Sequence, residues 1–163
     1  MRTLIIGYGN PSRRDDGVGL AVVNGLRRRL NRRPLEEGED GFAELGAATV
    51  DTLFLHQLVP ELAETLATYD RVWFVDAHLG VYPELVRHTR LAPSLEPALV
   101  SHQVKPEALL ALVAQLYGRA PEVELISIRG FDFDFGDELS QTTAEGAKQV
   151  VDELWQVIAP AEP

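Results

Sequence analysis

The sequence contains no cysteine among its 163 residues. This absence excludes disulfide bonds, thiolate metal ligands and a cysteine nucleophile, and it suits a reducing compartment. A metal site built by this chain alone would therefore consist of oxygen atoms and of imidazole nitrogens from its four histidines.

Long hydrophobic runs are also absent. No apolar segment approaches the length of a membrane span, and the N-terminal segment MRTLIIG lacks the extended apolar region and the small-residue cleavage site of a secretory signal. We therefore expect a cytoplasmic protein that does not insert into a membrane. The length is typical of one folding unit, so we expect a single domain over residues 1–163, present as a monomer.

Basic residues are scarce, with 15 against 25 acidic residues and a formal net charge of −10. Such a chain has no surplus of cations to neutralise phosphates, so a nucleic-acid partner is not expected. Five arginines nevertheless gather near the end of the first expected helix, where cations complement the negative end of the helix dipole. They form either a solvated helix end or a docking surface for an acidic protein. The cluster comprises Arg27, Arg28, Arg29, Arg32 and Arg33.

Apolar runs alternate with amphipathic segments along the whole chain. Buried parallel strands appear as continuous apolar runs, whereas helices show apolar residues every three to four positions. The alternation predicts an α/β fold in which helices cover both faces of a mostly parallel sheet. Strands are expected in TLII, in ATVDTL with its end near Asp51, in VWFV, in the antiparallel edge segment ELVRHTRL and in EVELISIRG. Helices are expected from about Asp16 to Leu30, in PELAETLATY, in HQVKPEALLALVAQLY and in TTAEGAKQVVDELWQVI, the last with Thr142 and Glu145 as a capping box.

The segment GYGNPSRRDDGVG (residues 7–19) joins the first strand to the first helix and begins like a phosphate-binding turn. A dinucleotide fingerprint needs a third glycine, however, and this chain has Ser12 there. Asp15 and Asp16 would also repel a phosphate at the start of the helix. The two carboxylates either cap the helix and complement its dipole, or bind a cation.

Four polar residues are expected at one edge of the sheet, because the carboxyl ends of parallel strands and the loops after them converge there. Asp16 follows the first strand, and Asp51 and Asp76 end two others. His102 precedes a helix. Two carboxylates and an imidazole can bind a divalent cation and leave coordination positions open for chemistry. Taken singly, Asp76 is also suited to cap its strand, and His102 to form a hydrogen bond at a helix start.

The pattern G-x-G-N-x-x-x-x-D-[DE]-G-x-G at residues 7–19 resembles the N-terminal signature of the hydrogenase maturation endopeptidases. The chain is also similar to this family in the apolar strand that ends at Asp76, in the SHQ of residues 101–103 before a leucine-rich helix, and in the strand that ends at Gly130. The resemblance spans nearly the whole chain. It implies a three-layer α/β/α sandwich with a twisted, mostly parallel sheet of about five strands.

The resemblance also implies an activity. It is that of a metal-dependent endopeptidase of the aspartic type, which removes the C-terminal extension from the precursor of a nickel-iron hydrogenase large subunit. The metal-binding residues of the family fall on Asp16, Asp76 and His102, and these residues together with Asp51 are the predicted catalytic residues. The nickel is the one already inserted in the substrate, whose cysteines can complete its coordination. A polarised backbone carbonyl and an activated water are alternative routes to hydrolysis.

The chain departs from the family pattern after the second strand, where VDTLFLHQLVPELAE replaces a glycine-rich turn, with Asp51 aligned to the acidic residue of that turn. His56 in this loop is either an auxiliary polar contact or a simple loop histidine. His78 is a rival ligand to His102, which keeps the family's sequence context. The stretch GFDFDFGDELS (residues 130–140) lacks the ligand order of a calcium loop, and we expect its phenylalanines to point inward on a loop that lines the substrate groove.

Two other functions are compatible with parts of the sequence. GYGNP resembles the early turn of peptidyl-tRNA hydrolase, but that enzyme needs a histidine shortly after the turn and a basic surface, whereas this chain has Asp15, Asp16 and a charge of −10. A non-catalytic nickel-sensing maturation chaperone would use the same three ligands without cutting the precursor. A change in the mass of the precursor separates the protease from the chaperone.

Overall fold

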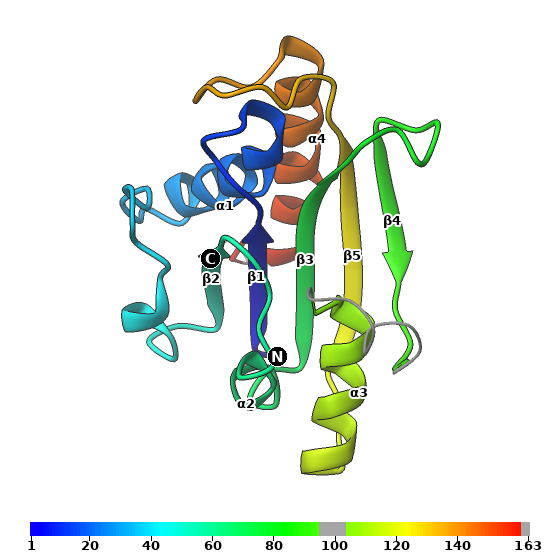
Figure 1. Ribbon diagram of the computed structural model, residues 1–163. Coiled ribbons are helices and arrows are strands. Elements are labelled where there is room, and N and C mark those ends of the chain that lie inside the picture. Colours follow the sequence, from blue (N-terminus) through cyan, green and yellow to red (C-terminus); the bar gives the residue numbers. More distant parts are fainter. Residues whose placement is uncertain (95–103, 161–163) are drawn as a thin grey trace.

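A five-stranded sheet forms the middle of the molecule (Figure 1). The computed structural model describes residues 1–94 and 104–160. The strands are β1 (Thr3–Tyr8), β2 (Val50–Leu55), β3 (Arg71–His78), β4 (Val86–Arg90) and β5 (Glu122–Arg129). Their order is β2-β1-β3-β5-β4, and every neighbouring pair is parallel except β4 with β5. The mostly parallel sheet and its antiparallel edge strand are therefore confirmed.

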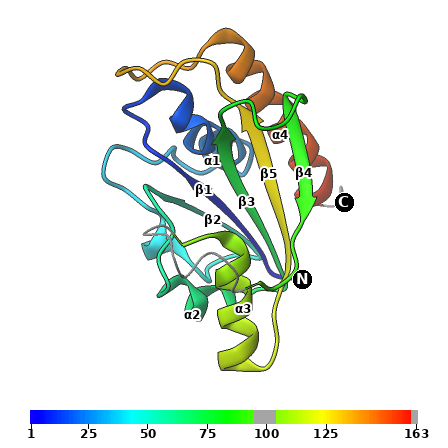
Figure 2. The ribbon, with the colours of Figure 1, turned by 45° about the vertical axis from the view of Figure 1, so that its right-hand side comes forward.

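Helices cover both faces of the sheet, which confirms the three-layer α/β/α fold (Figure 2). The helices are α1 (Val18–Arg29), α2 (Leu62–Leu66), α3 (Pro106–Tyr117) and α4 (Gln141–Ile158), and two 3₁₀ turns are η1 (Arg14–Gly17) and η2 (Phe42–Glu44). Helices α1 and α4 pack side by side on one face, and α2 and α3 pack on the other. No helix among residues 1–94 and 104–160 combines the length and the apolarity that a membrane crossing requires.

Two hydrophobic cores, one on each face of the sheet, hold the three layers together. On β3, Trp73 and Val75 point into the core beneath α1 and α4, whereas Val72 and Phe74 point into the core beneath α2 and α3. All four side chains are at most 5 % exposed. Because β3 is buried on both faces, its apolar run is continuous, and the strand is a firm support for the residues at its carboxyl end.

The turn after β1 packs closely against α1 and β3. A Cβ atom at Gly7 would lie 2.4 Å from the carbonyl oxygen of Gly19, and a Cβ atom at Gly19 would lie 2.8 Å from the carbonyl oxygen of Val75. Gly9 has a φ of 140°, and its Cβ atom would lie 2.2 Å from the carbonyl oxygen of Asp16. These glycines therefore allow backbone to approach backbone, and they bring η1 onto the ends of β1 and β3.

The connections leave β1 and β3 in opposite directions. After β1 the chain returns through α1 to β2 on one side, whereas after β3 it continues to the strands on the other side. In open α/β sheets, ligands bind in the crevice at the carboxyl ends of the two strands where the order reverses. The fold therefore places a binding crevice between the ends of β1 and β3.

Candidate functional site

Asp76 is the sixth of the eight residues of β3, next to the end of β1. The hydroxyl of Tyr8, the last residue of β1, donates a hydrogen bond of 2.8 Å to Oδ2 of Asp76. The other carboxylate oxygen, Oδ1, is buried and has no hydrogen-bond partner among the described residues. Buried carboxylate oxygens are almost always paired, so this oxygen is available to a metal ion or another ligand.

Burial sets the protonation of both members of this pair. It raises the pKa of Asp76 to about 6, an effect that the negative charges of Asp16 and Glu107 reinforce and the neighbouring hydroxyls oppose. The pKa of Tyr8 is raised well above its usual range, first by burial and then by the charge of Asp76, so Tyr8 stays a neutral donor. A carboxylate that titrates near neutral pH is typical of functional sites.

Asp16 approaches the same place from η1. Its Oδ2 accepts a hydrogen bond of 2.7 Å from the backbone N–H of Asn10, which closes the turn that follows β1. Among the described residues, no side chain makes a capping hydrogen bond at the start of η1 or of α1. Of the two alternatives that the sequence left open for these aspartates, capping of the first helix is therefore wrong, and Asp16 faces the strand ends instead.

Asp16 and Asp76 line one cavity of about 230 Å³ at the carboxyl edge of the sheet. Tyr8 and His56 also line this cavity, so it receives residues from the ends of β1, β2 and β3. Within residues 1–94 and 104–160, no group of three or more acidic or histidine side chains is arranged to hold a metal ion. The third ligand expected from the sequence, His102, lies outside these residues. The described part of the chain thus supplies two carboxylates of the predicted set of three ligands.

Asp51 lies at the opposite, amino edge of the sheet, and its predicted position beside Asp16 and Asp76 is wrong. The apolar run after Asp51 continues the strand to Leu55, so Asp51 is the second residue of β2 rather than its end. The side chain is 2 % exposed, and Oδ2 accepts hydrogen bonds of 2.6 Å from the Tyr69 hydroxyl and 3.0 Å from the backbone N–H of Gly46. Asp51 therefore links β2 to the loops at the amino edge.

His56 occupies the position that was expected for Asp51, because it is the first residue after β2. Its side chain is exposed, and it lines the cavity together with Asp16 and Asp76. The imidazole lies 6.0 Å from the Phe54 ring, measured between centroids. Of the two roles open to His56 from the sequence, a polar contact at the site is therefore the one that its position favours.

His78 ends β3 and is turned into the loop that leads to β4. Its ring is 8 % exposed and packs edge-on against Tyr82, with 5.3 Å between the ring centroids. The Nδ1 atom accepts a hydrogen bond of 3.1 Å from the backbone N–H of Gly80. Burial lowers the pKa of His78, which favours the neutral ring. These contacts give His78 a structural role in the β3–β4 loop.

Asp15, the neighbour of Asp16, is fully buried and holds the loop between β5 and α4. Its carboxylate accepts hydrogen bonds from the backbone N–H groups of Phe131, Asp132 and Ser140, at 2.7 to 3.0 Å. The hydroxyls of Ser140 and Thr143 donate to it as well, at 2.6 and 2.9 Å. Burial alone would raise the pKa of Asp15, but these hydrogen bonds outweigh it and lower the pKa to about 2. No local sequence pattern predicts this role of Asp15, because its donors lie more than 100 residues away.

Asp15 also replaces the predicted capping box of α4. The N-cap residue of that helix is Ser140, so Thr142 and Glu145 lie within the helix and the prediction that they cap it is wrong. The backbone N–H of Ser140 is bound by Asp15 from the other end of the chain. A carboxylate next to a helix start also interacts favourably with the helix dipole.

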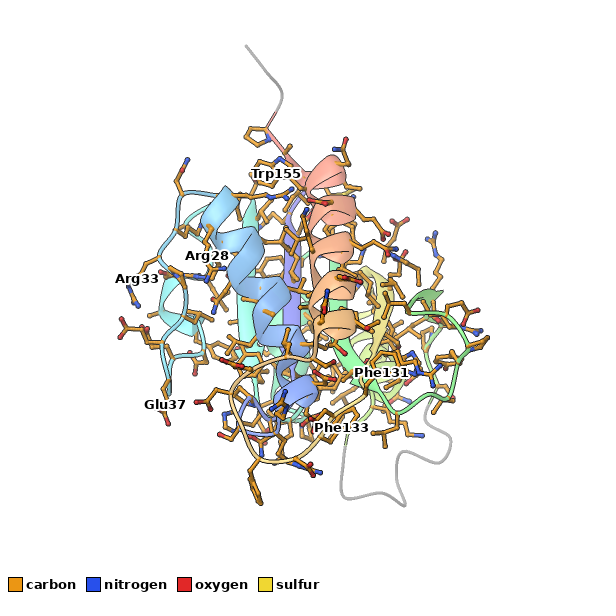
Figure 3. All side chains as sticks on the ribbon, turned by 90° about the horizontal axis from the view of Figure 1, so that it is seen from above. Arg28, Arg33, Glu37, Phe131, Phe133 and Trp155 are labelled. Carbon is orange, nitrogen blue, oxygen red and sulfur yellow. The ribbon has the colours of Figure 1, made fainter. Side chains whose placement is uncertain are left out.

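The loop of residues 130–140 lies beside η1 at the carboxyl edge of the sheet (Figure 3). Phe133 is half-buried and lies over Gly130 of the same loop, where an added Cβ atom would lie 2.3 Å from its ring. Phe131 and Phe135 are 52 % and 90 % exposed, so the expectation that they point inward is wrong. The loop is held by backbone hydrogen bonds to Asp15, and its position does not require these rings to be buried.

The arginine cluster is largely used within the chain. Arg27 is 1 % exposed, and its guanidinium lies 2.6 Å from a carboxylate oxygen of Glu44. Arg33 lies 2.7 Å from Glu39 and points outward beside α1 in Figure 3. Arg27 is therefore not part of a solvated helix end, and its charge is not available to a docking partner.

The architecture is that of solved proteases that mature nickel-iron hydrogenases. The maturating endopeptidase HybD from Escherichia coli matches with a TM-score of 0.68 and 19% identity, over 97% of this chain and 92% of that chain. The maturation protease HycI from Thermococcus kodakarensis KOD1 matches with a TM-score of 0.66 and 20% identity, over 98% of this chain and 93% of that chain. HybD from Thermococcus kodakarensis matches with a TM-score of 0.62 and 24% identity, over 96% of this chain and 99% of that chain. No protein-family model and no curated protein sequence matches the chain. The likeness to these solved structures, all below 25% identity, shows the fold alone.

Proposed function

We propose that this protein is an endopeptidase that removes the C-terminal extension from the precursor of a nickel-iron hydrogenase large subunit after nickel has been inserted. The observation that carries the proposal is the pair Asp16 and Asp76, which lines one cavity at the strand-order reversal of the fold. Solved maturation proteases have the same fold. The protein is proposed to act as a cytoplasmic monomer.

The nickel is proposed to arrive with the precursor, which makes it part of the substrate. Asp16 and Asp76 offer carboxylate oxygens, and His102 is the proposed imidazole ligand. The buried Oδ1 of Asp76 has no partner among residues 1–94 and 104–160 and fits this role, because a bound ion would satisfy it. A chain without cysteine leaves the soft thiolate ligands to the precursor, so productive binding requires a precursor that already holds its metal.

Hydrolysis of a peptide bond needs a polarised carbonyl or an activated water, and a divalent metal supplies either. The residues of this chain would hold the metal-bearing end of the precursor over the cavity. The Asp76 carboxylate is proposed to bind the metal-bearing end of the precursor in its ionised form.

The proposal is tested by incubating the protein with nickel-loaded and nickel-free precursor and measuring the mass of the precursor. Only the nickel-loaded precursor should be shortened. Asp16→Ala, Asp76→Ala and His102→Ala should abolish the shortening, whereas Glu64→Ala, which removes an exposed carboxylate on α2, should not. Undiminished processing by all three variants would remove the site assignment. Binding of the nickel-loaded precursor without a change in mass would instead identify a nickel-sensing chaperone.

A further inference from the structure

Tyr8, the last residue of β1, donates a hydrogen bond to the Asp76 carboxylate. Its hydroxyl lies 2.8 Å from Oδ2. Its ring packs edge-on against Phe74, two residues before Asp76 on the same face of β3, with 6.3 Å between the centroids. The ring is therefore held by packing, and the hydroxyl is held next to the carboxylate.

A second tyrosine–aspartate pair lies at the other edge of the sheet and provides a comparison. The hydroxyl of Tyr69 donates to Oδ2 of Asp51 at 2.6 Å. That oxygen also accepts a hydrogen bond from Gly46, and the guanidinium of Arg2 lies 3.9 Å away. Several donors thus converge on Asp51, as expected of a structural link. Asp76 accepts the Tyr8 hydroxyl on Oδ2, and among the described residues its buried Oδ1 has no hydrogen-bond partner.

We propose that Tyr8 is a positioning residue, which holds Oδ2 of Asp76 and thereby presents Oδ1 to the metal-bearing end of the precursor. The inference rests on the proposed function, since it takes Asp76 as a ligand of the precursor's nickel. The plane of a carboxylate rotates easily about its terminal torsion, so a hydrogen bond to one oxygen determines where the other oxygen points. Partners of this kind typically change metal affinity or activity by about 10 to 100-fold when they are removed.

The variant Tyr8→Phe removes the hydroxyl and keeps the ring that packs against Phe74. Tyr69→Phe is the matched control, because it removes the same atom from a tyrosine–aspartate pair remote from the cavity. Both variants should fold. Tyr8→Phe should lower kcat for the nickel-loaded precursor by about 10 to 100-fold with a smaller change in KM, because the rest of the precursor-binding surface is intact. Tyr69→Phe should leave both constants at the wild-type values.

A double variant separates positioning from a general loss of structure. If Tyr8 acts through Asp76, adding Tyr8→Phe to Asp76→Asn should not reduce the residual rate further, since coupled residues are not additive. A full additional loss in the double variant would overturn the inference. Equal kcat values for wild type and Tyr8→Phe would also overturn it.

Binding of Ni²⁺ alone, measured by calorimetry, tests the pair without the precursor. Tyr8→Phe should weaken Ni²⁺ binding by about 10 to 100-fold and Tyr69→Phe should not. This result together with an uncut nickel-loaded precursor would support the role of Tyr8 and reject the proposed protease. Equal Ni²⁺ affinity in wild type and Tyr8→Phe would reject the role of Tyr8, whatever happens to the precursor.

Discussion

Asp15, which is buried, and Asp76, which is half-buried, lie at the same edge of the sheet, and their surroundings shift their pKa values in opposite directions. Asp15 is surrounded by donors, and its pKa falls to about 2. Asp76 has few donors, and burial raises its pKa to about 6. The first carboxylate stabilises the fold in its charged form, whereas the second is charged at a cost to the fold. Charged residues that lower the stability of the fold are typical of functional sites rather than of structural ones.

Asp15→Asn should destabilise the protein strongly. Oδ2 of Asp15 accepts four hydrogen bonds and Oδ1 accepts one, so the NH2 group of an asparagine would face a donor in either orientation. We expect the free energy of unfolding at pH 7 to fall by about 3 kcal/mol, measured by urea denaturation. Asp137→Asn, at an exposed position, is the control and should have little effect. Equal urea midpoints for wild type and Asp15→Asn would contradict the anchoring role.

The stability of the protein should also depend on pH, because Asp15 anchors the loop only in its ionised form. The pKa of Asp15 is about 2 in the folded protein against 3.8 ordinarily. Its charge therefore stabilises the fold above about pH 4, and this contribution, about 2 kcal/mol, is lost as the pH falls from about 4 to 2. Wild type should lose this stability on acidification, and Asp15→Asn should lack that part of the loss.

Asp76→Asn should make the protein more stable at alkaline pH. The pKa of Asp76 is raised from 3.8 to about 6, so its stabilising contribution is complete below about pH 4 and is lost as the pH rises through about 6. Removing the charge should raise the free energy of unfolding by about 3 kcal/mol at pH 8 and change it little at pH 3.5. Urea denaturation at the two pH values measures this. A variant that is less stable than wild type at pH 8 would show that the ionised carboxylate supports the fold.

The sequence distinguishes the roles of neighbouring aspartates only in part. Asp16 was expected at the strand ends from its position after β1, and it lies there. The role of Asp15 depends on donors more than 100 residues away, which no local pattern reveals. One hint was available in retrospect, since Ser140 and Thr143 are polar residues at the start of a helix and a buried carboxylate needs such donors.

At the scale of secondary structure, the elements were predicted better than their ends. Continuous apolar runs identified the parallel strands, and the alternation in ELVRHTRL identified β4 as an antiparallel edge strand. The end of β2 was misplaced, because a polar residue inside a buried strand resembles a strand end. The error moved Asp51 to the wrong edge of the sheet and hid the position of His56, which the structure places at the cavity.

Gly19→Ala tests the close packing of α1 on the strands. A Cβ atom there would lie 2.8 Å from the carbonyl oxygen of Val75 and 2.9 Å from the backbone nitrogen of Tyr8, and backbone atoms cannot rotate away. We expect the free energy of unfolding to fall by about 2 kcal/mol or more, measured by urea denaturation. Gly25→Ala in the same helix is the control, since its nearest contact is a side-chain methyl group of Val151. An equal or larger loss in Gly25→Ala would contradict this account.

At the scale of the whole molecule, the two edges of the sheet differ. The amino edge is linked by structural contacts such as that between Tyr69 and Asp51. The carboxyl edge holds the cavity with Asp16 and Asp76, on a sheet that is packed on both faces. A rigid support of this kind holds reactive groups in place while the loops around them vary. The α/β order predicted this division of the molecule, because it places all the parallel strand ends on one side.

The rate at which Asp76→Asn shortens nickel-loaded large-subunit precursor, relative to wild type, tests the central claim most directly. The variant isolates function from folding, since we expect it to be at least as stable as wild type. The proposed site predicts that wild type shortens the precursor and that Asp76→Asn does so at least about 100-fold more slowly. Equal rates for the two proteins would contradict the assignment of the cavity as the active site.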